Sequence, residues 1–151
     1  MKWASYPALA LLALGFAVGA SAATVGGAAV QAHLGDAKLQ WGPCPPVFPR
    51  GCEIAVLHGD PAADHADVFL RVPAGYLIPP HRHTSPEHMT LVAGELAVTY
   101  AGQEPFTMRV GSYAFGPAKV PHTARCMSKV ACVLSIAFES AVDAEPATLA
   151  D

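Results

Sequence analysis

Short runs of apolar residues, separated by turn-forming residues, recur along most of the chain. They lie at Glu53–Leu57, Val68–Val72, Met89–Ala93, Leu96–Tyr100, Phe106–Val110, Tyr113–Phe115 and Val130–Phe138. Short strands with turn signals at nearly regular spacing are typical of all-β folds. Between residues 41 and 139 no convincing helical periodicity appears. The pattern therefore predicts one all-β domain, built as a closed antiparallel barrel or a double-sheet jelly roll.

The two ends of the chain do not follow this pattern. Residues 1–22 combine an early lysine, an apolar run and small residues, which predicts a cleavable signal peptide. A retained membrane anchor is the alternative, although the run is shorter than the ~20 residues that a spanning helix needs. We expect a flexible leader at 23–40, the barrel at 41–139, and a frayed tail with at most one helical turn at 140–151. The mature chain is then secreted or periplasmic.

Charge excludes one large class of partners. Removal of Lys2 with the signal peptide changes the formal net charge from −3 to −4, and no basic patch remains. Nucleic acid is therefore not expected as a partner. No membrane contact is expected after cleavage of the signal peptide.

Two histidines and a carboxylate stand close together between residues 81 and 87. Side chains alternate along a strand, so His81 and His83 point to the same face, with Cα atoms about 6.6 Å apart. Two imidazoles placed in this way can bind one metal ion through bonds of about 2.1 Å. A turn at Thr84–Pro86 lets the chain bring Glu87 back to the same point. Alternation sends His88 to the opposite face, where we expect a surface histidine.

A second block supplies a further histidine after a proline-containing turn. Together the two blocks resemble the two motifs of the cupin superfamily. The first motif, Gly-x5-His-x-His-x3-Glu-x6-Gly, is matched throughout by Gly75, His81, His83, Glu87 and Gly94. The second, Gly-x5-Pro-x-Gly-x2-His-x3-Asn, is matched at Gly111, Pro117 and His122. It departs at Lys119 and Cys126, where the family has Gly and Asn.

The resemblance covers roughly residues 41–139 and implies a single-domain cupin-type double-stranded β-helix, or jelly-roll barrel, that holds one metal. It implies the ligands His81, His83, Glu87 and His122. Three imidazoles and one carboxylate suit divalent Fe, Mn, Ni, Co or Zn without selecting among them. Glu87 is also the candidate catalytic base, because the motifs contain no second carboxylate; metal-bound hydroxide is the other possibility. A cupin barrel that keeps the motif but carries no metal is the alternative.

The implied ligand set is similar to that of quercetinase-like, germin-like and acireductone-type cupins, in which dioxygen or its reduced forms react at the metal. It implies a metal-dependent, dioxygenase-like enzyme acting on a small organic molecule. Two alternatives stay open: a non-catalytic module that binds a metal or a small ligand, and a barrel held together by structural zinc. Inward-facing Met89 and Leu91 suit an aromatic or otherwise uncharged ligand. By resemblance, a homodimer formed through an edge strand is also expected.

Four cysteines lie in the predicted mature chain, without a Cys-x2-Cys pair that would indicate a zinc–thiolate site. An even number in a chain predicted to be exported favours disulfides, and four cysteines allow three connectivities. The local pairing Cys44–Cys52 would close the proline-rich segment into a loop, and Cys126–Cys132 would join the last hairpin. Four buried free thiols are the alternative. Cys126 shares the inward parity of His122 and could instead be a free thiol near the cavity.

The proline-rich segment that opens the domain forbids helix and central strand alike. Its prolines, concentrated between residues 43 and 49, predict extended backbone lying across the barrel. We expect Trp41 and Phe48 to close an open end of the barrel.

Overall fold

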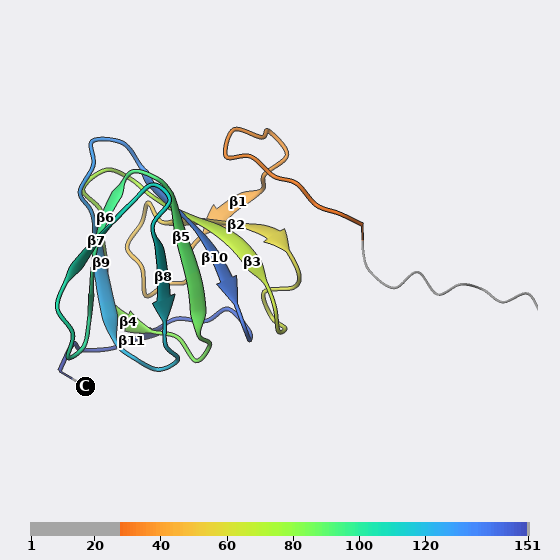
Figure 1. Ribbon diagram of the computed structural model, residues 1–151. Helices are drawn as coiled ribbons and strands as arrows, with labels where there is room; N and C mark the ends of the chain where they lie inside the picture. Colours follow the sequence, from red (N-terminus) through yellow and green to blue (C-terminus); the bar gives the residue numbers. More distant parts are fainter. Residues whose placement is uncertain (1–27, 151) are drawn as a thin grey trace, which may run out of the picture.

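The structure, a computed structural model, describes residues 28–150, so the predicted signal peptide lies outside the described residues. Two antiparallel sheets face each other (Figure 1). The first has the strand order β1 (Trp41–Pro43), β2 (Glu53–His58), β3 (Asp67–Val72), β10 (Cys132–Phe138), β5 (Glu87–Ala93) and β8 (Tyr113–Gly116). The second has the order β11 (Glu145–Pro146), β4 (Leu77–Arg82), β9 (His122–Cys126), β6 (Glu95–Tyr100) and β7 (Phe106–Arg109). The prediction of an all-β jelly roll is confirmed.

The core lies between the sheets and follows the alternation of each strand. In β6, Leu96, Val98 and Tyr100 are buried while the residues between them are partly exposed. In β5, Met89 and Leu91 are buried on the inner side. Burying a side chain of this size contributes about 1.5–3 kcal/mol to folding. The sheets are therefore held together by alternate side chains of their strands, as the two-residue period of a strand requires.

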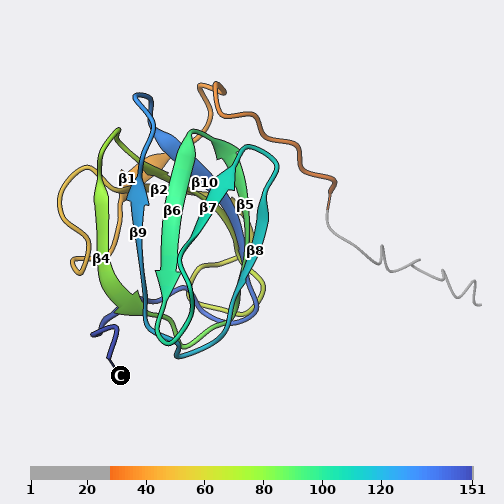
Figure 2. The same cartoon turned by 60° about the vertical axis from the view of Figure 1, so that its left-hand side comes forward.

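Strand register gathers the predicted site residues at one place. In the second sheet β4, β9 and β6 lie side by side (Figure 2), and His122 on β9 is paired with His81 on β4 and with Tyr100 on β6. In the first sheet Glu87 is paired with Gly116 on β8. The side chains of these residues therefore meet across the interior.

The proline-rich segment between β1 and β2 behaves only partly as expected. Phe48 is buried, and its ring meets His81 edge-on, with centroids 4.8 Å apart. Trp41 instead lies in the edge strand β1, where the Arg71 guanidinium lies 3.9 Å from the centre of a Trp41 ring. The expectation that Trp41 closes the barrel was wrong, because pairing with β2 holds it along the sheet edge.

The C-terminal tail is not frayed. Residues Glu145–Pro146 form β11, which pairs with the end of β4, and the Glu145 carboxylate accepts a 3.0 Å hydrogen bond from Arg82. Backbone hydrogen bonds from Val142 to the carbonyl of residue 61 and from Ala147 to the carbonyl of residue 80 extend this attachment. The expectation of a frayed tail with a helical turn was wrong, because a two-residue strand leaves no alternation in the sequence.

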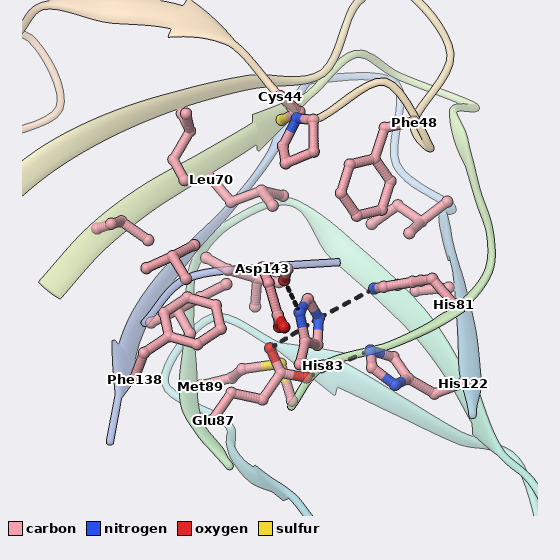
Figure 3. A pocket seen from close by; sticks show the side chains of 18 of the residues that line it. Cys44, Phe48, Leu70, His81, His83, Glu87, Met89, His122, Phe138 and Asp143 are labelled. Carbon is pink, nitrogen blue, oxygen red and sulfur yellow. Dashed lines mark hydrogen bonds and ion pairs between the residues drawn. The ribbon is translucent and has the colours of Figure 1, made fainter. Parts of the chain in front are cut away.

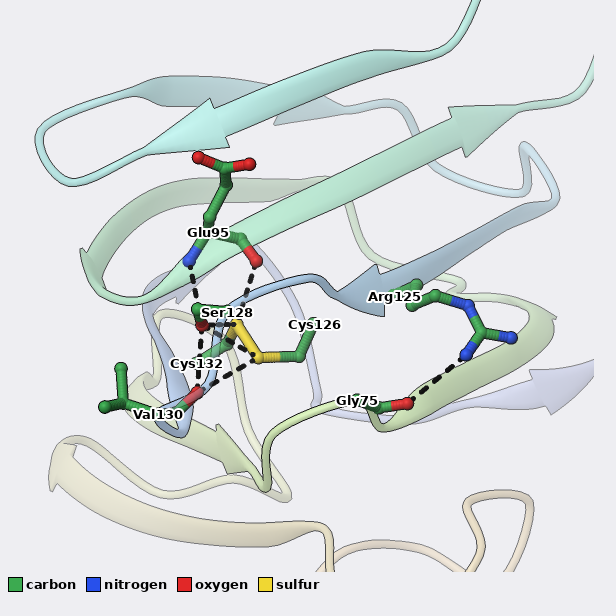
Figure 4. Close-up of a disulfide and its surroundings, with 7 residues drawn as sticks. All are labelled: Gly75, Glu95, Arg125, Cys126, Ser128, Val130 and Cys132. Atoms are coloured by element: carbon green, nitrogen blue, oxygen red, sulfur yellow. Dashed lines mark hydrogen bonds between the residues drawn. A yellow bond between two sulfur atoms is a disulfide. The ribbon is translucent and has the colours of Figure 1, made fainter.

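Both predicted disulfides are present, Cys44–Cys52 and Cys126–Cys132, and no free cysteine remains in the described part of the chain. The second bridge joins the end of β9 to the start of β10 and lies beside the Ser128 hydroxyl (Figure 4). Two disulfides fit an oxidising compartment. Residues 28–150 form no helix long and apolar enough to cross a membrane.

Candidate metal centre

Three buried histidines converge inside the barrel. His81 lies near the end of β4, His83 directly follows that strand, and His122 begins β9. Their ligand atoms all lie within 4.8 Å of one another, and His81 Nε2 is 3.1 Å from His83 Nε2 (Figure 3). Just before His81, the pairing of β4 with β9 is irregular at Pro79 and Pro80, which lack the N–H groups that a regular ladder needs. Strand pairing thus places His81 and His122 side by side, and His83 follows directly after the paired strand.

Glu87, the first residue of β5, brings a carboxylate to the same point. Its side chain is only 3% exposed. Its Oε1 is 3.2 Å from His122 Nε2, and its Oε2 is 3.6 Å from His83 Nε2. Donor atoms of neighbouring ligands on one ion, with bonds of about 2.1 Å, lie about 3.0–3.4 Å apart. The structure therefore brings together all four residues that the cupin resemblance singles out.

Backbone carbonyls fix the protonation of each imidazole. The Nδ1 atoms of His81 and His122 face the carbonyls of Pro79 and Val120 at 2.8 and 3.2 Å, and that of His83 faces the carbonyl of Asp143. A carbonyl only accepts, so each Nδ1 carries the proton and each Nε2 keeps a lone pair directed into the site. Two neutral lone pairs 3.1 Å apart cannot hydrogen-bond to each other. A cation between them would satisfy both lone pairs. In known metal sites, too, the ligating histidine usually donates its other ring N–H to a carbonyl or carboxylate, which orients the ring.

The charge of the site also fits a cation. Among the described residues Glu87 Oε1 is buried and finds no hydrogen-bond partner, and a carboxylate charge buried in this way is costly unless a cation lies near the group. Burial raises the pKa of Glu87, but the neighbouring imidazoles of His122, His83 and His81 outweigh it, so the net direction is downward. Burial, followed by repulsion from His122 and His83, lowers the pKa of His81 to about 3. At neutral pH the site therefore presents an ionised carboxylate and a neutral imidazole, the forms that bind metals.

A residue that we did not anticipate, Tyr100, lies against this centre. Its ring stacks on His122 with centroids 4.8 Å apart and planes at 30°, and its buried hydroxyl has no hydrogen-bond partner among residues 28–150. Burial and then the Glu87 charge raise the pKa of Tyr100, so the phenol keeps its proton and can only be a donor toward a carboxylate. The sequence could have indicated this position, because Tyr100 lies on the same face of its strand as the apolar residues Leu96 and Val98.

The tail supplies a second unanticipated residue, Asp143. Its carbonyl accepts from His83 Nδ1, while its carboxylate accepts hydrogen bonds from the Thr84 amide at 2.9 Å and the Thr84 hydroxyl at 2.6 Å. The carboxylate bonds hold residue 143 so that its carbonyl can orient the imidazole. Nothing in the sequence motifs points to this role, because Asp143 lies 60 residues after His83 and meets it only where the C-terminal segment packs beside the end of β4.

A cavity of about 50 Å³ adjoins the histidines. Its wall is mainly apolar and comes from both sheets and from the proline-rich segment: Phe48, Ile78, Met89, Val98, Leu134 and Phe138 are among its lining residues. Among residues 28–150, Glu87 and Asp143 are the acidic side chains in this lining, and no lysine or arginine belongs to it. The apolar wall predicted from Met89 is thus present, while predicted inward-facing Leu91 is buried in the core.

His88 points away from the centre, as alternation predicts. Its Nε2 lies 2.9 Å from the Glu139 carboxylate and its Nδ1 2.7 Å from the Tyr113 hydroxyl, and its side chain is 40% exposed. Neither His88 nor Tyr113 belongs to the cavity lining.

Comparison with known proteins identifies relatives of this fold. A family model described as the cupin domain matches residues 68–138. A solved RmlC-like cupin from Shewanella frigidimarina superposes with a TM-score of 0.57 and 19% identity, over 75% of this chain and 94% of that one. The chain belongs to the cupin superfamily. In this cupin the family model ends at residue 138. The C-terminal segment, whose Asp143 carbonyl orients His83, therefore lies outside the matched region.

Other structural neighbours of this cupin differ widely in their names. The DMSP lyase DddQ from Ruegeria pomeroyi is 22% identical with a TM-score of 0.57, over 67% of this chain and 56% of the lyase. The cupin domain of Cnp3 from Schizosaccharomyces pombe is 17% identical with a TM-score of 0.54, over 62% and 67% of the two chains. No curated protein matches the sequence. Identities this low establish the shared fold alone.

Proposed function

We propose that this cupin binds one divalent transition metal through His81, His83, His122 and Glu87. We further propose that it is a metal-dependent, dioxygenase-like enzyme acting on a small organic substrate. One observation carries the metal site: three imidazoles held from behind by carbonyls aim their lone pairs, with a buried carboxylate, at one point. Fe, Mn, Ni, Co and Zn all accept such a donor set.

The metal would supply Lewis acidity and, if it is redox-capable, reactivity toward dioxygen. The chain's own contribution is to hold the donors still and to exclude water. Each imidazole is fixed by its Nδ1 bond, and Phe48 covers His81. Glu87 is the acidic group beside the histidines, and we assign it the role of base that takes a proton from the substrate.

The cavity constrains the charge of the substrate. A divalent ion with one carboxylate has a net charge of +1, which one singly charged chelating group would neutralise. In the part of the chain that the structure describes, no lysine or arginine lines the cavity to pair with a second negative charge, and an unpaired buried charge is strongly unfavourable. An uncharged or singly charged molecule with an apolar body fits this wall best.

The size of the cavity favours a second candidate function. A volume of about 50 Å³ holds only a few water-sized groups. A metal-binding or small-ligand-binding module without turnover, or structural zinc, would need no more room than this. The enzyme differs from these alternatives in requiring a redox-capable metal that accepts an external ligand.

We also propose that the chain is exported with loss of residues 1–22, which the two disulfides support. Mass spectrometry of the exported protein should show an N-terminus near Ala23, and an intact Met1 would contradict export with cleavage. A homodimer formed through an edge strand remains a proposal, and sedimentation of the purified chain would test it.

Metal analysis of matched variants tests the site. The unaltered protein should hold one equivalent of metal, His83→Ala and His122→Ala should lose most of it, and Glu87→Gln should bind it more weakly. His88→Ala is the control, because this histidine faces outward. Full metal content in all three site variants would refute the ligand assignment. Dioxygen uptake with enols and catechols then tests the enzyme, and a zinc-filled site without turnover would favour the binding module.

A further inference from the structure

Two buried oxygens without hydrogen-bond partners lie near each other in the described part of the chain. They are Glu87 Oε1 and the Tyr100 hydroxyl. A Cβ atom placed on Gly116 would lie 2.7 Å from each of them, so they are at most twice that distance apart. Buried polar atoms without partners are rare in folded proteins. An acceptor and a donor, both unpaired and adjacent, can satisfy each other through a small rotation or one bridging water.

The fold holds both groups in this place. Tyr100 comes from the second sheet, where its ring stacks on His122 at 4.8 Å and on Phe106 at 6.2 Å. Glu87 comes from the first sheet, directly opposite Gly116 on β8. The ring contacts leave the tyrosine little lateral freedom, so the carboxylate is the part that can turn.

Gly116 has no backbone reason to be glycine. Its φ lies outside the left-handed region that favours glycine, unlike that of Gly111 or Gly94. What it provides is space, because any side chain there would collide with Glu87 and with the Tyr100 hydroxyl. The three residues therefore form one unit: a donor, an acceptor and the space in which they meet.

We propose that Tyr100 is a positioning residue that donates a hydrogen bond to the Glu87 carboxylate, and that Gly116 preserves the space for this contact. The inference rests on the proposed metal site: when one carboxylate oxygen ligates the ion, the other needs a donor. His122 does not supply it, since its Nδ1 proton is directed to the Val120 carbonyl. Loss of such an outer partner typically weakens metal binding 10- to 100-fold.

Cobalt(II) titration of the full chain, followed by its visible absorption band, tests the assignment. Tyr100→Phe should bind cobalt about tenfold more weakly and change the band, because the carboxylate is less constrained. Because Phe keeps the ring that stacks on His122, the thermostability of the metal-free variant should change little compared with the loss of cobalt affinity. Tyr113→Phe is the matched control: it also loses a hydroxyl, but on the outer face beside His88.

Two further comparisons separate positioning from packing. In an E87A background, Tyr100→Phe should cause no further loss of cobalt affinity, because the acceptor is already gone. Gly116→Ala should weaken cobalt binding, and Tyr100→Phe should partly rescue it by removing one of the clashing atoms. Gly42→Ala, where a Cβ meets nothing within 4 Å, is the control for adding a methyl group.

The outcomes distinguish this inference from the proposed function. An unaltered chain that binds no metal would overturn both. A chain that binds cobalt equally well with and without the Tyr100 hydroxyl would overturn the inference alone. So would a loss of affinity that matches a loss of metal-free stability, or one that persists unchanged in the E87A background.

Discussion

Acid should destabilise the metal-free protein, and His81 should be a main cause. Burial and the charges of His122 and His83 lower the pKa of His81 from 6.5 to about 3. Between these values the unfolded chain binds a proton that the folded chain does not, so the free energy of unfolding falls as pH decreases below about 6.5. At pH 5, about 1.5 pH units below the ordinary value, the loss relative to pH 7 is about 2 kcal/mol.

Urea unfolding at pH 7 and pH 5, with a chelator present, measures this loss. His81→Leu removes the titrating group while keeping an apolar side chain against Phe48, so its stability should fall by about 2 kcal/mol less than that of the unaltered chain. His88→Ala, at an exposed position, should behave like the unaltered chain. Glu87 acts in the same direction but at lower pH, because its lowered pKa makes its stabilisation disappear only below the ordinary value of 4.5. An equal acid sensitivity of His81→Leu and the unaltered chain would refute the reasoning.

Three further predictions concern the parts of the fold that support the site. Asp143→Ala removes both bonds to Thr84 and should weaken metal binding about tenfold by loosening His83, measured by competition with a chromogenic chelator. Gly94→Ala should lower the free energy of unfolding by about 2–4 kcal/mol in a urea melt, because a Cβ would meet the disulfide at 2.8 Å and φ is +84°. Gly102→Ala, with φ +70° and open space, should lose only about 1–2 kcal/mol. Thiol titration of the denatured, unreduced chain should find no reactive thiol, and four would contradict both disulfides.

The residues that could be predicted from the sequence are those whose geometry is local. The shared face of His81 and His83 follows from the two-residue period of a strand. The pairing of Cys44 with Cys52 follows from their short separation in a chain expected to be exported. Glu87 was assigned by the cupin resemblance, and the turn before it makes its return to the site possible.

What could not be predicted depends on which strands become neighbours. Tyr100 reaches His122 because β6 pairs with β9 in one particular register, and Gly116 faces Glu87 because β5 pairs with β8. The hydrophobic alternation within one strand does not determine which strand pairs with it or in which register. Asp143 lies in an irregular segment before a two-residue strand, so periodicity carried no information about it.

The three bonds from Nδ1 to the backbone also bear on the speed of metal exchange. A histidine on a flexible loop can swing away from an ion and let solvent enter one coordination position at a time. Here an imidazole can leave only after breaking its bond to the main chain, and His83 must also pull away from the segment fixed by Thr84 and β11. Release would then require a local opening of the barrel wall, and an ion, once taken up, would be held for longer than its equilibrium affinity alone indicates.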